Sequence, residues 1–140
     1  MSSLTHTPTG RRSPLTVVGG VIAAIVAASA VNALLAIAAR AIADRTDDFG
    51  PLNPGSYIFL TAVGIVLGSV GWAAVCKVSK RPEHLLRRLV PAVVVVSFVP
   101  DFFLFDDGGA VGVTALLLMH VAVAVIAVPV YRRVMPLTAR

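Results

Sequence analysis

Residues 77–88 read KVSKRPEHLLRR and carry five of the twelve basic residues of the chain. A long apolar segment lies on each side of this stretch. Short loops rich in Lys and Arg stay on the cytoplasmic side when a membrane protein is inserted. The stretch is therefore predicted to be a cytoplasmic loop. Its position sets the direction in which every other segment crosses the bilayer.

The composition is typical of a membrane protein. Of the 140 residues, 57% are hydrophobic and 14% are charged, which leaves too few polar side chains to cover a soluble globule of this size. Four apolar runs, at 15–39, 57–76, 89–105 and 110–131, each approach the roughly 20 residues that cross a hydrocarbon core. The sequence predicts an all-α, polytopic membrane protein: a bundle of four transmembrane helices over residues 15–134, with a disordered cytoplasmic tail at 1–14 and a cytoplasmic tail at 135–140.

The distribution of charge predicts that both termini are cytoplasmic. With residues 77–88 inside, the inner surface holds ten basic residues against the single acid Glu83, whereas the two outer loops hold two arginines against five aspartates. This asymmetry is the one expected for a multi-pass protein of a plasma membrane. The basic charge is attributed to membrane retention and to attraction for anionic lipid headgroups, so the lipid bilayer is the expected partner and nucleic acid is not.

The first apolar run allows an alternative interpretation. Arg11, Arg12 and the residues after them could form a signal peptide, with Ala28, Ser29 and Ala30 as a small-residue cleavage site. The run continues past that site to Ala39, which favours an uncleaved span. Cleavage would leave the direction of the later segments unchanged.

Small residues in the second run indicate a packing face. Gly64, Gly68 and Gly71 are expected to share one seam of the helix, because residues three and four apart lie on the same side. Small residues let two helices approach closely where lipid supplies no hydrophobic driving force. The seam is predicted to pack inside the bundle or, if it is exposed, to form a homodimer or to contact another membrane partner.

Polar residues inside the apolar runs form the candidate site. Asn32 lies in the first run, Ser97 and Asp101 are four residues apart in the third, and His120 lies in the fourth. A carboxylate within a bilayer must be paired, hydrated or protonated. We therefore expect a polar cluster in the outer half of the bundle, with an ion pair between Arg40 and Asp101 and with Asn32 and His120 below it. The cluster could bind a ligand or a proton, or it could fix the order of the helices.

Several kinds of chemistry are not indicated. No two His or Cys residues share a helix face, so no metal site is predicted. The sequence contains no nucleophile elbow, phosphate loop, dinucleotide fingerprint or haem-attachment motif, so no cofactor and no enzyme activity are expected. Seven of the nine aromatic residues lie toward the outer side. They indicate either an interfacial belt or a pocket for an apolar or lipid-like ligand.

Several short motifs resemble one family. Gly71-Trp72, Arg81-Pro82, the run Ser97 to Asp101 (SFVPD) and Met119-His120 are similar to those of the domain of unknown function family 6069, a group of small bacterial membrane proteins. The resemblance covers roughly residues 15–131. It implies a four-span membrane protein typical of high-G+C bacteria, and it implies no particular activity.

Three classes of function follow from these observations. The first is a non-enzymatic membrane module, either an accessory subunit or a binder of a small ligand. The alternative is a small proton-coupled transporter that uses Asp101 and His120. It resembles the small multidrug transporters in size, but Asn32 stands in the first helix where those proteins have a carboxylate. A membrane enzyme comes third, because it would need chemistry supplied by a cofactor or partner.

Overall fold

A computed structural model describes residues 13–137, and this part of the chain is all-α with no strand. Three helices are long and apolar enough to cross a membrane: α1 (Pro14–Ile42), α2 (Pro54–Val78) and α5 (Phe105–Val134). Between α2 and α5 lie α3 (Pro82–Ser97) and the single turn α4 (Val99–Phe102). Most of the predicted N-terminal tail and the last three residues lie outside the described residues.

Prolines mark where the helices begin. Pro14, Pro54 and Pro82 each stand in the first turn of a helix, where a missing N–H costs no hydrogen bond. Ser13 caps α1, because its Oγ accepts a hydrogen bond from the backbone N–H of Thr16 at 3.3 Å. The expectation that residues 77–88 form one loop was therefore wrong. Helix α2 continues to Val78 and α3 starts at Pro82, so only residues 79–81 connect them.

The third apolar run is not one continuous helix. Helix α3 ends at Ser97, and α4 resumes at Val99 with Pro100 in its first turn. Proline at position 100 has no N–H to donate, so it favours a break before it. After α4 a tight turn leads into α5, which bends at Gly109, where φ is +62°. A left-handed φ of this kind favours glycine.

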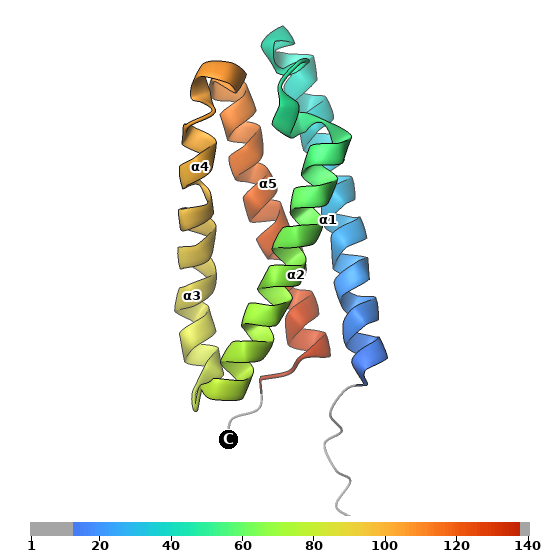
Figure 1. The fold of residues 1–140 in the computed structure, drawn as a ribbon, viewed down its shortest axis with the longest axis vertical. Helices are drawn as coiled ribbons and strands as arrows, with labels where there is room; N and C mark the ends of the chain where they lie inside the picture. The colour runs from blue at the N-terminus through green and yellow to red at the C-terminus, as the bar shows by residue number, and fades with distance from the viewer. Residues whose placement is uncertain (1–12, 138–140) are drawn as a thin grey trace, which may run out of the picture.

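The helices lie side by side, and α5 contacts each of the others (Figure 1). Helix α1 packs against α5 and α2, α3 packs against α2 and α5, and α4 packs against α5. The start of α1, the connection between α2 and α3, and the end of α5 lie at one end of the molecule (Figure 1). The opposite end holds the α4–α5 turn and the α1–α2 connection, which contains the short helices η1 (Asp44–Thr46) and η2 (Gly50–Leu52). We call these the basic end and the acidic end after the charges described above.

The core is built from small residues on α1 and larger ones on its neighbours. At each end of the molecule a cluster of buried side chains joins α1 to α2 and α5. At the acidic end Phe49 packs on α5, where Gly108 and Gly112 leave room for its ring. At the basic end Trp72 and Tyr131 lie with ring centroids 5.7 Å apart. Many large apolar side chains, among them Leu34, Leu67 and Val125, instead face outward. An outward apolar surface is typical of helices that face lipid.

The predicted glycine seam is only partly a packing face. A Cβ added at Gly68 would lie 3.0 Å from the hydroxyl of Tyr131, so this glycine does meet another helix. Gly64 and Gly71 are exposed and have nothing within 4 Å of such a Cβ. The buried face of α2 is instead formed by Tyr57, Thr61, Ile65 and Trp72. Each residue turns the helix by about 100°, so Gly64 and Gly71 lie to one side of that face.

Candidate functional site

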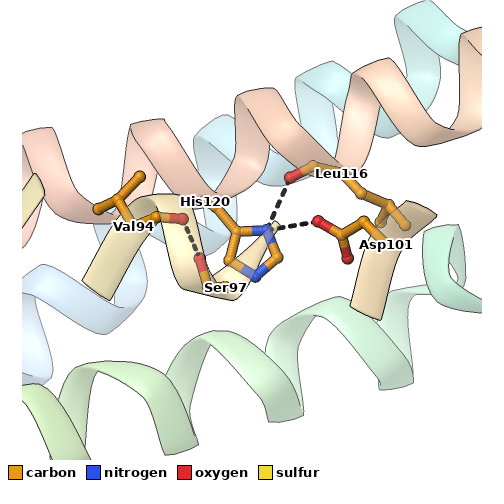
Figure 2. A network of polar contacts seen from close by, with 5 residues as sticks. All are labelled: Val94, Ser97, Asp101, Leu116 and His120. Carbon is orange, nitrogen blue, oxygen red and sulfur yellow. Dashed lines mark hydrogen bonds and ion pairs between the residues drawn. The ribbon is translucent and has the colours of Figure 1, made fainter. Parts of the chain in front are cut away.

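Asp101 and His120 contact each other across the interface between α4 and α5 (Figure 2). Nδ1 of His120 lies 3.1 Å from Oδ2 of Asp101. The Asp101 residue is 6% exposed, whereas the His120 side chain is 37% exposed. The break after Ser97 turns α4 so that the carboxylate faces α5. The sequence placed both residues in one polar cluster, and the structure brings these two members into contact.

The backbone of α5 determines which ring nitrogen of His120 carries a proton. Nδ1 lies 2.9 Å from the carbonyl oxygen of Leu116, one helical turn earlier. A carbonyl oxygen can only accept a hydrogen bond, so Nδ1 must be the protonated nitrogen. Oδ2 of Asp101 is buried and has no hydrogen-bond donor among the described residues, although it lies beside the same Nδ1. No described residue hydrogen-bonds to Nε2, which points away from Asp101 (Figure 2).

Ser97 does not join the pair. Its Oγ donates a hydrogen bond to the carbonyl oxygen of Val94, 2.7 Å away in the same helix (Figure 2). This is a common way for serine to satisfy its hydroxyl within a helix. Ser97 is therefore not held by His120, and the three side chains do not form the relay of a serine hydrolase.

Arg40 lies elsewhere, and the predicted ion pair between Arg40 and Asp101 was wrong. The terminal Nη2 of Arg40 donates to the carbonyl oxygen of Leu52 at 3.1 Å and to Oδ1 of Asn53 at 3.0 Å. Arg40 thus ties the last turn of α1 to the residues before α2, while α4 packs against α5. The Leu52 carbonyl oxygen and the Asn53 amide oxygen are both acceptors that suit a guanidinium, which explains this choice of partners.

Asn32 belongs to a separate contact between α1 and α2. Its Nδ2 donates to Oγ1 of Thr61 at 2.9 Å, and both side chains are buried. Oδ1 of Asn32 has no donor within the described part of the chain. The amide therefore fixes the approach of two helices and does not contact the Asp101–His120 pair. Of the five predicted site residues, the structure joins only Asp101 and His120.

Sequence reasoning missed three neighbours of these groups. The Leu116 carbonyl lies four residues before His120, so helical spacing alone could have identified it. The ring of Phe98 meets that of His120 edge-on, with centroids 6.2 Å apart and planes at 77°. Neither Phe98 nor Thr61 carries a sequence signal that indicates its partner, because both contacts depend on how two helices are rotated.

The surroundings limit the chemistry of the site. The described residues include no group of three His, Cys, Asp or Glu side chains that could hold a metal ion. An apolar groove of about 290 Å³ between α1 and α5 is lined by aliphatic residues and Thr114. This groove, found at the acidic end, has no aromatic residue in its lining. The site therefore brings together one carboxylate and one imidazole, and the described residues around them complete no metal-binding group of three such side chains.

Comparisons with known proteins identify the family. A search of curated proteins and a search of solved structures each found no significant match. The model of a family of unknown function, DUF6069, matches residues 11–136. The match covers all the helices and both members of the Asp101–His120 pair, so this chain belongs to the DUF6069 family.

Proposed function

We propose that the chain is a four-span integral membrane protein of a bacterial plasma membrane, with both termini in the cytoplasm. Helices α1, α2 and α5 supply three spans. Helices α3 and α4 follow each other from Pro82 to Phe102, roughly 30 Å if taken as one segment, and we assign the charged first turns of α3 to the headgroup level and the remainder to the fourth span. The charges support the orientation, because the start of α1 and the end of α5 lie at the same end of the molecule as the basic α2–α3 connection.

Within this arrangement the protein acts as a non-enzymatic recognition module. The observation that carries this proposal is the asymmetry of the Asp101–His120 pair. The carboxylate is buried, while the imidazole is partly exposed and leaves Nε2 free of described partners. An ionisable group at membrane depth is costly and is usually retained for a function. Nε2 of the Nδ1-protonated ring is an acceptor, so the expected ligand or membrane partner carries a hydroxyl or N–H in apolar surroundings.

A substitution that removes Nε2 of His120 and keeps the fold tests whether this residue recognises a ligand or partner. His120→Phe keeps an aromatic ring and removes both nitrogens, and Leu67→Phe is the control, since Leu67 is an exposed residue of α2 that contacts neither Asp101 nor the cavity at the basic end. Native mass spectrometry of each variant, purified in nanodiscs formed directly from cell membranes, reports the molecules that remain bound. We expect a small molecule or partner that is lost from the His120 variant and retained by the Leu67 variant. Identical bound species in all three proteins would refute recognition through His120.

The alternative function, a small proton-coupled transporter, is favoured by one specific observation. Two titratable side chains lie 3.1 Å apart, so a proton can pass between them. In proteoliposomes with an imposed pH gradient, a transporter would accumulate a cationic amphiphile such as ethidium, and Asp101→Asn would abolish the flux. Asp107→Asn, at an exposed position at the start of α5, is the control. A recognition module keeps its bound species and gives no flux in any of these proteins.

A further inference from the structure

A cavity of about 410 Å³ lies at the basic end, in a different part of the molecule from the Asp101–His120 pair. Its walls are residues of the α2–α3 connection, the first turns of α3 and the residue Leu137 that follows α5. Three of the lining side chains, Lys80, Arg81 and Arg87, are cationic, and Glu83 is the one acid. We propose that this cavity binds the phosphate group of an anionic phospholipid headgroup.

The cations that line the cavity are not neutralised by the protein. Among the described residues, Lys80, Arg81 and Arg87 form no ion pair, with Glu83 or with any other carboxylate. Arg81, Glu83, His84 and Arg87 are exposed at the cavity wall. Guanidinium groups bind phosphate oxygens through paired hydrogen bonds, so two arginines on one cavity are suited to a phosphodiester. The net positive lining favours an anion over a zwitterion, whose choline or ethanolamine group would add another cation.

The position of the cavity favours a lipid over a free anion. Trp72, whose Nε1 donates to the carbonyl oxygen of Met135 at 3.1 Å, is expected at the boundary between hydrocarbon and headgroups. Helix α2 ends six residues later at Val78, about 9 Å along the axis, so the α2–α3 connection lies at the level of the headgroups. Lipid phosphates are present at this level, at high local concentration.

The surface beyond the cavity is suited to an acyl chain. His84 and Arg87 lie on one side of α3, and the same side continues toward the membrane centre with Pro91 and Val95. Pro91 is exposed, and Val95 is 62% exposed. A phospholipid with its phosphate in the cavity can therefore lay its apolar chain along this side of α3. A free phosphate ion would make no use of that surface.

The proposal requires that the chain be inserted in the membrane, and it is independent of the role of His120. The test uses the full-length chain in detergent, with native mass spectrometry to measure retention of added phosphatidylglycerol and phosphatidylcholine. Arg81→Gln/Arg87→Gln is compared with Arg132→Gln/Arg133→Gln, a pair of exposed arginines in the last turn of α5 that do not line the cavity. Both double variants lose two charges at the same end, so bulk electrostatics cannot distinguish them. Circular dichroism melting in each sample shows whether the fold is intact.

We expect the wild-type chain to retain phosphatidylglycerol at least tenfold more strongly than phosphatidylcholine. The cavity variant should weaken retention of phosphatidylglycerol by roughly 10- to 30-fold, and the α5 variant by less than threefold. Glu83→Gln should strengthen retention of phosphatidylglycerol, because it removes the one acid of the lining. If the loop had only a structural role, this substitution would not strengthen retention. Equal loss in the two arginine variants, or equal retention of the two lipids, would overturn the site. Displacement of phosphatidylglycerol by millimolar inorganic phosphate would overturn the assignment to lipid.

Discussion

His120 lies with Nδ1 3.1 Å from Oδ2 of Asp101, yet that nitrogen hydrogen-bonds to the Leu116 carbonyl oxygen at 2.9 Å, and Oδ2 has no hydrogen-bond donor among the described residues. The carboxylate is therefore held beside the imidazole mainly by the packing of α4 on α5 and by electrostatic attraction. A buried carboxylate oxygen without a directed donor is costly, because its lost hydration is only partly replaced. Replacing only one of the two residues should therefore lower the stability of the protein more than replacing both with apolar residues.

The first prediction concerns that coupling. His120→Leu should lower the free energy of unfolding by about 2 kcal/mol, because Asp101 is left buried without its partner. Adding Asp101→Leu should recover more than half of this loss. Steric-trapping measurements in bicelles give the free energy of unfolding of the wild type, the two single variants and the double variant, which together form a double-mutant cycle. Ser97→Ala is the control and should change stability by less than about 0.5 kcal/mol, since its hydroxyl bonds only within α3. Additive losses would show that the pair is not coupled.

The second prediction concerns the contact between α1 and α2. Thr61→Val keeps the shape of the side chain and removes the acceptor for Nδ2 of Asn32, 2.9 Å away. Both polar ends of the buried amide would then lack described partners. The expected loss is about 1 kcal/mol, the usual size of an interhelical hydrogen bond in a membrane. Thr114→Val, at an exposed position on α5, should have no measurable effect in the same unfolding assay. Equal effects of the two substitutions would contradict the predicted role of the Asn32 contact.

The three long apolar helices and their order along the chain were predictable from the sequence. Hydropathy is summed over some 20 residues, so the apolar runs that became α1, α2 and α5 were identified despite local errors of a few residues at their ends. The break near Pro100 was signalled by proline itself. The helical start of α3 was missed because the charged residues 83–88 were read as a loop, although Pro82 and Glu83 are favourable in a first helical turn.

The faces of the helices were harder to predict than their limits. One residue turns a helix by about 100°, so a seam drawn through Gly64 and Gly71 missed the buried face, which runs through Ile65 and Trp72. Asp101 and His120 were found because an ionisable side chain in an apolar run must face protein. Arg40 could not be assigned, because its partners are a backbone carbonyl and an amide of an irregular connection that has no periodic signal.

The third prediction concerns the close approach of Phe49 to α5. A Cβ at Gly108 would lie 2.7 to 2.9 Å from three atoms of the Phe49 ring. Gly108→Ala should therefore cost about 1–3 kcal/mol by overpacking, and Phe49→Leu in the same chain should recover part of that cost. Gly19→Ala is the control, because nothing lies within 4 Å of the added methyl group. In that variant stability should stay the same or rise slightly. A neutral Gly108→Ala would mean that the ring does not occupy this position.

The fourth prediction concerns the glycines of α2 and separates helix packing within one chain from helix packing between two chains. Gly68 lets the hydroxyl of Tyr131 reach the carbonyl oxygen of Ile65, so Gly68→Leu should displace that ring and cost about 2 kcal/mol or more. A Cβ at Gly64 has no neighbour within 4 Å among the described residues, so Gly64→Leu should leave unfolding of the isolated chain unchanged within about 0.5 kcal/mol.

Self-association then gives an independent result for the exposed glycine. Self-association is measured by energy transfer between differently labelled copies in liposomes. Gly55→Leu is the control, because a Cβ at Gly55 also has no described neighbour within 4 Å. If a second copy packs on the exposed side of α2, Gly64→Leu should abolish the transfer while Gly55→Leu preserves it, because close helix approach needs the small residue. Transfer that survives in both variants would exclude a homodimer through Gly64. A loss of stability in isolated Gly64→Leu chains would instead show that this side of α2 is covered within the monomer.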